Sequence, residues 1–349
     1  MARVLAAMSG GVDSSVAAAL LVEGGHEVVG VTLKLWDNPG DSGCCSVNEI
    51  EDARRVAQQL GIDHWVFGFT DEFEARVVGP YTQAHAAGLT PNPCIECNRH
   101  LKFGKLLARA RQLGFDAVAT GHHARRRTDR SGDHHLLRGA DGAKDQSYVL
   151  YVLGQEELAR CRFPVGELTK DEVRARARAL GLRTADKPDS QDVCFVTTSG
   201  GRASLLAGRI PLTPGRVVDA AGRQVGRVDA VELVTVGQRR GLGTGGGERR
   251  FALSVDPGAG TVTAGGLADL MVDRVAVAAP VWVAGRPPAP DQPLEVQCSA
   301  HGRPVPARTD GPTVVFDQPQ RRVAPGQSVV FYSGDEVLGG AVAVRDKRM

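Results

Sequence analysis

The sequence predicts an α/β protein with a parallel-sheet domain at the N-terminus, a small β-rich domain in the middle and a β-barrel at the C-terminus. Three observations predict this class. Strand-like and helix-like segments alternate over residues 1–200, a pattern typical of a parallel sheet covered by helices. A glycine-rich turn joins the first strand to the first helix. Beyond residue 200, glycine and proline become more frequent and short strand-like runs replace the helical periodicity.

Apolar and β-branched runs in the first part predict strands at 4–8, 28–35, 64–69 and 116–120. Periodic segments predict helices at 14–23, 49–60, 99–113 and 168–180. A glycine follows each of these helices directly, and glycine is the residue most enriched just past a helix C-terminus. We therefore expect residues 1–200 to form one α/β catalytic domain.

Short runs in the second part predict two groups of strands. The first group covers 216–219, 231–236 and 251–255, and the second covers 275–283, 294–298, 313–316, 328–332 and 337–344. We assign the first group to a central domain over 201–266 and the second to a barrel over 267–349.

Composition limits the class of protein. The chain has 349 residues, 42% of them hydrophobic and 23% charged, with a formal net charge of +2, which is ordinary globular composition. No apolar run approaches the roughly 20 residues that cross a bilayer, and polar residues from Ser9 to Ser15 interrupt the apolar N-terminus. We expect a cytoplasmic monomer with no membrane partner. Seven cysteines in such a chain indicate reduced, chemically used thiols rather than a disulfide framework.

The turn after the first strand reads Ser-Gly-Gly-Val-Asp-Ser-Ser over residues 9–15, named here the glycine loop. Two glycines let the backbone approach an anion, and hydroxyl groups and helix N-terminal N–H groups then point at it. The lysine of the nucleoside-triphosphate loop is absent, which favours a pyrophosphate cradle over that motif. The alternative to a pyrophosphate site is a glycine-rich strand–helix turn that binds no ligand. A second match, GxGxxG at 241–246, lacks a following helix, and we interpret it as a mobile loop.

Two cysteines, Cys94 and Cys97, form a Cys-x-x-Cys in a proline-rich loop ahead of the 99–113 helix, where the helix dipole favours thiolates. Such a pair fits redox chemistry, half a zinc site or iron–sulfur ligation. Cys194 lies in a polar loop. Cys161 and Cys298 sit in apolar surroundings and are interpreted as buried hydrophobes. Two roles remain for the vicinal pair Cys44 and Cys45, which could ligate a metal or be incidental exposed thiols.

Seven motifs, spread in order over the chain, resemble the bacterial tRNA-specific 2-thiouridylases, enzymes with a PP-loop, the pyrophosphate-binding loop of adenine nucleotide alpha hydrolase-like domains. They are Ser9–Ser15, Thr90-Pro-Asn-Pro-Cys94 with Cys97-Asn98, Ala119-Thr-Gly-His122, Lys144-Asp-Gln-Ser-Tyr148, Asp189 to Cys194-Phe, Val236-Gly-Gln-Arg-Arg-Gly-Leu-Gly243, and Pro325-Gly-Gln-Ser328. The resemblance implies ATP- and Mg²⁺-dependent replacement of the 2-oxygen of the tRNA wobble uridine by sulfur.

The resemblance also implies site residues. Nucleotide contacts are implied for Ala7, Met8, Ser9, Gly10, Gly11, Val12, Asp13, Ser14, Leu33 and Gly121. Contacts to tRNA, through the anticodon stem-loop, are implied for Asn92, Pro93, Cys94, His122, Lys144, Asp145, Gln146 and Gln327. The pyrophosphate released from ATP would lie in the glycine loop. Several arginines offer positive charge for phosphates as a group: 125–127, Arg174, Arg176, Arg178, 239–240 and 321–322.

By resemblance, Cys194 carries a persulfide and Cys97 is the paired catalytic thiol that closes a disulfide with it as sulfur departs. A cysteine desulfurase or a sulfur-relay protein would load Cys194. Position 94 is often aspartate in the family, whereas this chain has Cys94, which we include among the catalytic residues. The substitution leaves a second route open, in which Cys94, Cys97 and Cys194 hold a [4Fe–4S] cluster that delivers the sulfur.

Two rival functions differ in class. One is a PP-loop enzyme that adenylates a small molecule, and the presence of both Cys97 and Cys194 argues against it. The other is a non-enzymatic RNA-binding or sulfur-carrier protein, which would have no use for the glycine loop.

Overall fold

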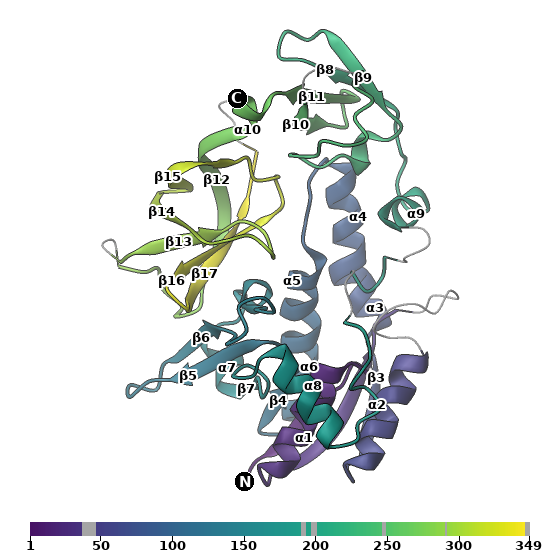
Figure 1. Ribbon diagram of the computed structural model, residues 1–349, viewed down its shortest axis with the longest axis vertical. Coiled ribbons are helices and arrows are strands. Elements are labelled where there is room, and N and C mark those ends of the chain that lie inside the picture. Colours follow the sequence, from purple (N-terminus) through teal and green to yellow (C-terminus); the bar gives the residue numbers. More distant parts are fainter. Residues whose placement is uncertain (37–46, 190–192, 197–200, 246–248, 290–291, 346–349) are drawn as a thin grey trace.

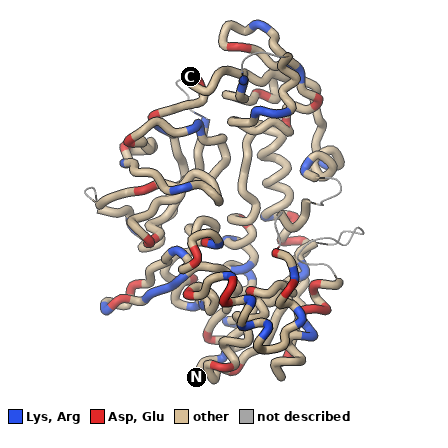
Figure 2. The backbone as a smooth tube through the Cα atoms, viewed as in Figure 1, with Lys and Arg blue, Asp and Glu red and all other residues tan. Residues whose placement is uncertain are grey.

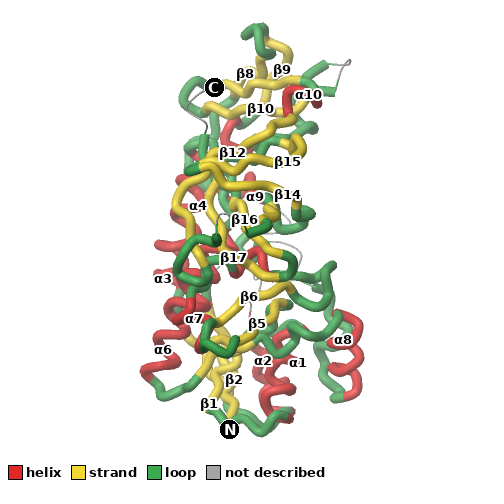
Figure 3. The backbone as a smooth tube through the Cα atoms, turned by 90° about the vertical axis from the view of Figure 1, so that its left-hand side faces the viewer, coloured by secondary structure: helices red, strands yellow, loops and turns green. Residues whose placement is uncertain are grey.

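The computed structural model describes residues 1–36, 47–189, 193–196, 201–245, 249–289 and 292–345. Three parts follow one another along the long axis of the molecule, and the side view in Figure 3 shows the same stacking. A parallel-sheet domain lies at one end, a β-barrel lies beside the middle, and a small β-sheet lies at the other end (Figure 1). The expected fold class is confirmed.

The N-terminal domain is built on five parallel strands in the order β3-β2-β1-β4-β7. Their bounds are β1 Arg3–Ala7, β2 Glu27–Lys34, β3 His64–Gly68, β4 Ala117–Ala119 and β7 Cys161–Arg162. The chain runs from β1 outward to β2 and β3, then returns to place β4 on the other side of β1. This reversal creates a switch point at the carboxyl ends of β1 and β4, where ligands of such sheets bind.

Helices cover both faces of this sheet because alternate residues of β1 point to opposite sides. Val4 and Ala6 face a core shared with α1 Val12–Glu23, α2 Val47–Gln59 and α8 Lys170–Ala179. Leu5 faces the second core, formed with a group of helical segments on the other side. They are α3 Thr70–Phe73, η1 Glu74–Val78, α4 Gly79–Ala86, η2 Asn98–Lys105, α6 Leu106–Gln112 and α9 Gly201–Ala207.

The central sheet has the strand order β10-β11-β8-β9. Its strands are β8 Gly215–Val218, β9 Gln224–Val228, β10 Phe251–Asp256 and β11 Thr261–Gly265, and α10 Leu267–Leu270 follows β11. The predicted strand at 231–236 is wrong. Val231 and Val234, three residues apart, both enter the central core, which is the spacing of the 3₁₀ turn η4 Val231–Leu233 rather than of a strand.

The C-terminal barrel closes through pairing of β12 with β17 around the order β12-β15-β14-β13-β16-β17. Its strands are β12 Met271–Trp282, β13 Leu294–Gln297, β14 Val305–Asp310, β15 Thr313–Arg321, β16 Ser328–Ser333 and β17 Glu336–Ala343. The expected strands of this region are present. A hairpin of the N-terminal part, β5 Ala124–Thr128 with β6 His134–Arg138, pairs with β17 and extends the barrel sheet, so that residues of both domains share it.

Short helical segments connect these parts: α5 Pro93–Cys97, η3 Ser147–Leu150 and α7 Gln155–Arg160. The prediction that the Cys-x-x-Cys lies in a loop is wrong. The motif lies in α5, which continues into η2 and α6. The reason is local, because Asn92 caps the helix and Pro93 occupies its first turn. Leu242 is buried in a turn, and the next element of the described residues is the strand β10 rather than a helix. Among the residues that the structure describes, no helix is long and apolar enough to span a membrane.

Candidate active site

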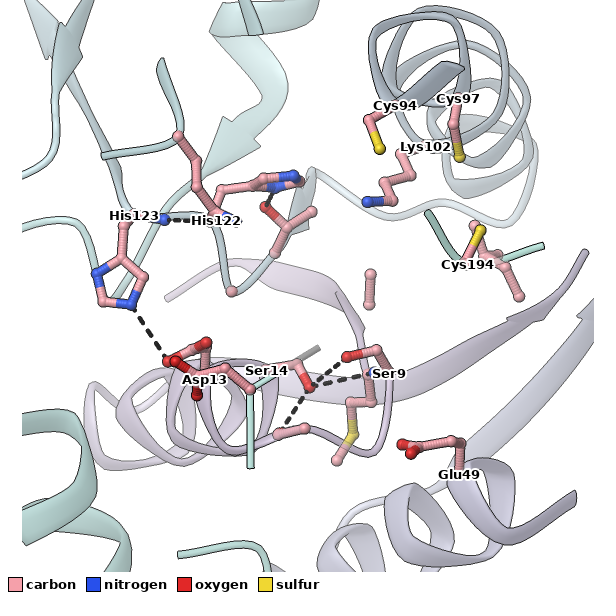
Figure 4. A pocket seen from close by; sticks show the side chains of 18 of the residues that line it. Ser9, Asp13, Ser14, Glu49, Cys94, Cys97, Lys102, His122, His123 and Cys194 are labelled. Carbon is pink, nitrogen blue, oxygen red and sulfur yellow. Dashed lines mark hydrogen bonds and ion pairs between the residues drawn. The ribbon is translucent and has the colours of Figure 1, made fainter. Parts of the chain in front are cut away.

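A cavity of about 510 Å³ lies at the switch point of the parallel sheet. Its walls come from the glycine loop, the carboxyl ends of β2 and β4, α5, the loop 143–146, the segment 187–189, and residues 193–195. Figure 4 looks into it, with Ser9, Asp13 and Ser14 on one side and the three cysteines Cys94, Cys97 and Cys194 on another. A nucleotide-sized ligand can therefore reach the glycine loop and the thiols within one enclosure.

The glycine loop is held in an anion-binding shape by its own hydroxyl groups. Ser14 Oγ donates to Gly11 O at 3.0 Å and accepts from the Ser9 N–H at 3.1 Å. Gly10 has φ +75°, and a β-carbon there would lie 2.4 Å from Glu49 O, so this position needs glycine. Gly11, the N-cap residue of α1, has no side chain that could accept from the first-turn N–H groups of the helix. The first-turn N–H groups of α1 are thus directed at the cavity end of the helix, where they can bind phosphate.

Asp13, in that first turn, is held by two side chains from other segments. His123 Nε2 lies 3.2 Å from Asp13 Oδ1, and Lys170 Nζ lies 2.7 and 2.8 Å from its two oxygens. Burial alone would raise the pKa of Asp13, but hydrogen bonds from His123 and Lys170 outweigh it and lower that pKa. Because a carboxylate only accepts, His123 Nε2 carries the hydrogen. Its buried Nδ1 has no protein partner among the described residues.

Asp189 ties its own segment to the loop 143–146 and to α8. It pairs with Lys144 of the loop 143–146 at 2.8 Å, and with Lys170 at 2.8 Å and Arg174 at 2.9 Å, both from α8. Burial raises the pKa of Asp189, but hydrogen bonds from Lys144 and Lys170 dominate and lower it to about 2. The carboxylate is therefore ionised over the physiological range and holds the chain a few residues ahead of Cys194 against the glycine-loop side of the cavity.

Lys187 fastens the same segment to the other side of the glycine loop. Its Nζ donates to Gly10 O at 3.1 Å and pairs with Asp52 and Glu49 of α2, each at 2.8 Å. Burial would lower the pKa of Lys187, but hydrogen bonds with Asp52 and Glu49 raise it. Lysines from the α8 region thus reach the loop from two directions.

The cysteines differ in exposure. Cys94 is exposed, Cys97 is 7% exposed, and Cys194 is intermediate. Cys94 and Cys97 lie on α5, whose first turn is capped by Asn92 Oδ1 accepting from the Cys94 N–H at 3.1 Å. In Figure 4 the sulfurs of Cys94 and Cys97 point toward the part of the cavity where Cys194 lies, with Lys102 between the helix and the centre.

The three thiols of the cavity do not converge on a single metal ion. Within the described ranges, no three His, Cys, Asp or Glu side chains converge closely enough to hold a metal ion. Cys94, Cys97 and Cys194 therefore line one cavity without forming a preassembled ligand set. Two other cysteines lie away from it. Burial raises the pKa of Cys161, and that of Cys298 to about 12, so neither supplies a thiolate near neutral pH.

His122 and the barrel complete the wall opposite α1. His122 is 8% exposed and its Nδ1 lies 2.7 Å from Thr120 Oγ1, while burial lowers its pKa well below the ordinary value. It is therefore neutral at pH 7. His301 reaches the cavity from the barrel, on a turn whose carbonyl groups at 299 and 300 accept from Gln297 Nε2. The cavity is thus made by both domains.

Most of the residues proposed from the sequence meet at this cavity. Those that line it are Ala7, Met8, Ser9, Gly11, Val12, Asp13, Ser14, Leu33, Pro93, Cys94, Cys97, Gly121, His122, Lys144, Asp145, Gln146 and Cys194. Gly10 lies behind the loop against Glu49. Asn92 and Gln327 are not part of the cavity wall. Asn92 caps α5, and Gln327 Nε2 donates a hydrogen bond to Thr90 O at 2.6 Å. Cys44 and Cys45 lie outside the described residues.

Sequence reasoning missed several residues of the wall: Glu49, Lys102, His123, Lys170, Lys187 and His301. Some of the arginines singled out for RNA phosphates are instead paired with acids, among them Arg174 with Asp189, Arg178 with Asp186 and Arg125 with Asp335. Figure 2 shows this mixing of basic and acidic residues around the parallel-sheet domain.

Two family models match the chain. Residues 2–198 match the "tRNA methyl transferase HUP domain" and residues 272–343 match the "Aminomethyltransferase beta-barrel domain". The tRNA-specific 2-thiouridylase MnmA of Chloroflexus aurantiacus is 50% identical over 99% of both chains. The protein of the same name from Acidothermus cellulolyticus is 48% identical over 99% of this chain and 98% of its own.

Among solved structures, a 4-thiouridine synthetase–RNA complex with bound ATP is 19% identical and covers 56% of this chain and 45% of its own. Its TM-score of 0.37 is too low to support an inference about function.

Proposed function

This chain belongs to the family of tRNA-specific 2-thiouridylases named MnmA, and from that premise we propose that it thiolates the wobble uridine of tRNA through adenylation and a persulfide. Membership of the family makes it an enzyme that transfers sulfur to tRNA. The use of ATP, the identity of the uridine and the roles of individual cysteines are the finer parts of the proposal.

One observation carries it: the anion-binding end of α1 and all three candidate cysteines line the same cavity. A uracil oxygen is a poor leaving group, so it must be activated before sulfur can replace it. Activation and sulfur transfer must then occur on one base without release. A single enclosure holding both sets of groups meets that need, whereas an enzyme that only adenylates a small molecule has no use for the thiols.

In the first step, uracil O2 attacks the α-phosphorus of ATP. The O2–P bond forms, the bond from the α-phosphorus to the bridging oxygen breaks, and pyrophosphate leaves with the electron pair while the N3 proton is lost. The first-turn N–H groups of α1 and the hydroxyls of Ser9 and Ser14 are placed to bind the released pyrophosphate. Mg²⁺ would enter with the phosphates, and Asp13 or Asp189 can offer a carboxylate oxygen to it.

In the second step, the terminal sulfur of a Cys194 persulfide attacks C2 and AMP leaves. Cys97 then attacks the inner sulfur of Cys194, so that the sulfur–sulfur bond breaks, the C2 thiocarbonyl keeps the outer sulfur, and a Cys97–Cys194 disulfide forms. An external dithiol must reduce that disulfide. Disulfide formation requires the two Cα atoms to come within roughly 4.4–6.8 Å. The sulfur itself comes from a desulfurase or a relay protein that reaches Cys194.

For the base to reach this cavity, the wobble nucleotide must leave its stack, as expected for an anticodon-loop base read by a modifying enzyme. Pro93 and Cys94 at the start of α5, His122 after β4 and Lys144 to Gln146 form the surrounding wall. We propose these side chains as the contacts of the flipped uridine and its neighbours.

The test is mass analysis of the nucleosides of tRNA incubated with the enzyme, ATP and a sulfur source. We expect 2-thiouridine with wild type and with Cys298→Ala, a cysteine outside the cavity wall, and none with Cys97→Ser or Cys194→Ser. ATP–pyrophosphate exchange must depend on added tRNA and survive in Cys97→Ser. Exchange without tRNA would indicate a small-molecule substrate instead.

A further inference from the structure

Lysine is rare in this chain and gathers at one place. The sequence has 35 arginines and seven lysines. Four of those lysines, Lys102, Lys144, Lys170 and Lys187, line the cavity, whereas no arginine is among the described residues that line it. Arginine is the commoner cation by far, so the cavity wall has a specific requirement for a compact ammonium on a flexible stem.

Lys170 is the lysine of this group that contacts the first turn of α1, through Asp13. It begins α8, which packs against α1, and its side chain is 10% exposed. Its ammonium touches Asp13 in the first turn of α1 and Asp189 on the other side. Lysine is almost never this buried unless it is paired, and here two carboxylates compensate the charge.

The formal charges of the cavity wall balance, so the wall has no net positive charge to offset the negative charge that a triphosphate keeps beside one Mg²⁺. The wall holds the carboxylates of Asp13, Glu49, Asp145 and Asp189 against the four lysines. The glycine loop itself contains no lysine, unlike the loop that binds the β- and γ-phosphates in other nucleotide enzymes. A triphosphate at the end of α1 therefore needs a cation from another segment.

We propose that Lys170 is that cation: it binds the β- and γ-phosphates of ATP and stabilises the pyrophosphate that leaves in adenylation. Its ammonium exchanges one carboxylate oxygen for a phosphate oxygen, and its flexible stem permits this shift without moving α8. As the bond from the α-phosphorus to the bridging oxygen breaks, the negative charge that grows on pyrophosphate lies beside Lys170. This assignment rests on the proposed function, because it takes ATP as the substrate of the cavity.

Lysine suits this role better than arginine for a geometric reason. A guanidinium would form a planar, two-pronged pair with Asp13 or Asp189 and would be held there. An ammonium offers three hydrogens in any direction, so it can keep a carboxylate and gain a phosphate oxygen at once. The release of pyrophosphate then restores the paired state found in the structure.

The test compares nucleotides that share the base and differ in phosphates. In Lys170→Met, we expect the Kd of ATP to rise roughly 10- to 100-fold, because the variant loses a charge-assisted contact with the phosphates. The Kd of adenosine should stay within about twofold, and inhibition by pyrophosphate should weaken in parallel with ATP. The matched control is Lys105→Met, because Lys105 makes a comparable pair with Glu72 at 2.8 Å but lies outside the cavity wall.

Removing Lys170 takes one cation away from each of two carboxylates, Asp13 and Asp189. The second variant is therefore Lys170→Met/Asp189→Asn, in which one of the two is replaced by a neutral amide. Equal losses of ATP and adenosine affinity in a folded variant would overturn the proposal and make Lys170 a structural residue. An unchanged ATP affinity would overturn it as well. These nucleotide affinities are measured without tRNA or sulfur. A wild-type enzyme that binds ATP through Lys170 but forms no 2-thiouridine would therefore contradict the thiolation proposal alone.

Discussion

A β-carbon added to Gly121 would lie 2.6 Å from the backbone nitrogen of Ser14. The turn after β4 therefore rests directly on the first turn of α1, and the two sides of the switch point meet as backbone on backbone. Neither partner is the end of a flexible side chain, so neither can yield without moving the helix or the turn. This contact sets the width of the cavity at the place where phosphate is expected.

Gly121→Ala should therefore reduce the free energy of ATP binding by more than it reduces the free energy of unfolding. The methyl group forces α1 and the turn after β4 apart, a strain of about 1–3 kcal/mol. We expect ATP affinity, measured by calorimetry, to fall at least tenfold. Gly68→Ala is the control, because a β-carbon at Gly68 meets nothing within 4 Å. Equal ATP affinity in the two variants would show that the contact does not shape the site.

Cys94→Asp separates the two sulfur routes. The persulfide route needs only Cys97 and Cys194 as sulfur carriers, so we expect this variant to keep forming 2-thiouridine. A cluster held by three thiols would lose a ligand and with it most activity and iron. The measurement is thiolation together with iron and acid-labile sulfide in anaerobically purified protein. About four irons per wild-type chain, lost in the variant, would contradict the persulfide route.

His135 makes the joint between the β5–β6 hairpin and the barrel dependent on pH. Its Nδ1 lies 2.7 Å from Glu336 of β17 and its Nε2 lies 3.2 Å from Asp129, while Arg127 acts against protonation. The hydrogen bond with Glu336, and then that with Asp129, outweigh burial and raise the pKa of His135. A raised pKa means that the folded state holds the proton more tightly. The stabilisation is complete below about pH 6.5 and is lost as pH rises through the folded-state pKa.

We therefore expect the difference in unfolding free energy between wild type and His135→Gln to be about 1 kcal/mol larger at pH 6 than at pH 8. Urea unfolding at the two pH values measures it. A difference that grows toward pH 8 would show that the neutral imidazole makes the stronger contact.

The sequence could predict the parallel-sheet domain because its strands and helices carry strong local signals. The strand at 4–8, the glycine loop and the helix after it each have a distinct pattern, and they were found with small shifts at their ends. The β5–β6 hairpin gave no such signal. It reads Ala-Arg-Arg-Arg-Thr and His-His-Leu-Leu-Arg, and only Ala124 and Leu136 are buried in it. It is a strand pair because β17 supplies an edge, which is a tertiary cause.

The candidate site divides in the same way. Glycine-loop and cysteine residues stand in short motifs, so their joint presence in one cavity could be anticipated. Lys170 and His301 lie in segments far from those motifs and reach the cavity only through packing of α8 and the barrel, whereas Lys187 stands two residues before one of them. One signal was available in advance: seven lysines against 35 arginines mark each lysine as a residue to be explained.

Arg138 links the barrel to the cavity loop, and its loss should weaken both. Its guanidinium donates to Asp145 at 2.8 Å and to Gln297 at 3.1 Å, and lies 3.6 Å from the centre of the Tyr332 ring. Asp145 is only 6% exposed and also accepts from Ser147. Arg138→Met leaves that carboxylate with neutral donors alone, so we expect a loss of about 3 kcal/mol in unfolding free energy.

Arg111→Met is the control, because Arg111 on α6 pairs at 2.7 Å with Glu156 and both side chains are more than half exposed. An exposed pair of this kind contributes at most about 1 kcal/mol. Urea denaturation of both variants measures the contrast. Since Gln297 also holds the turn that carries His301, the Arg138 variant should show faster amide hydrogen exchange at 299–302, and the Arg111 variant should not. Equal destabilisation, or unchanged exchange at the turn, would mean that the barrel is positioned by its sheet pairing with β6 alone.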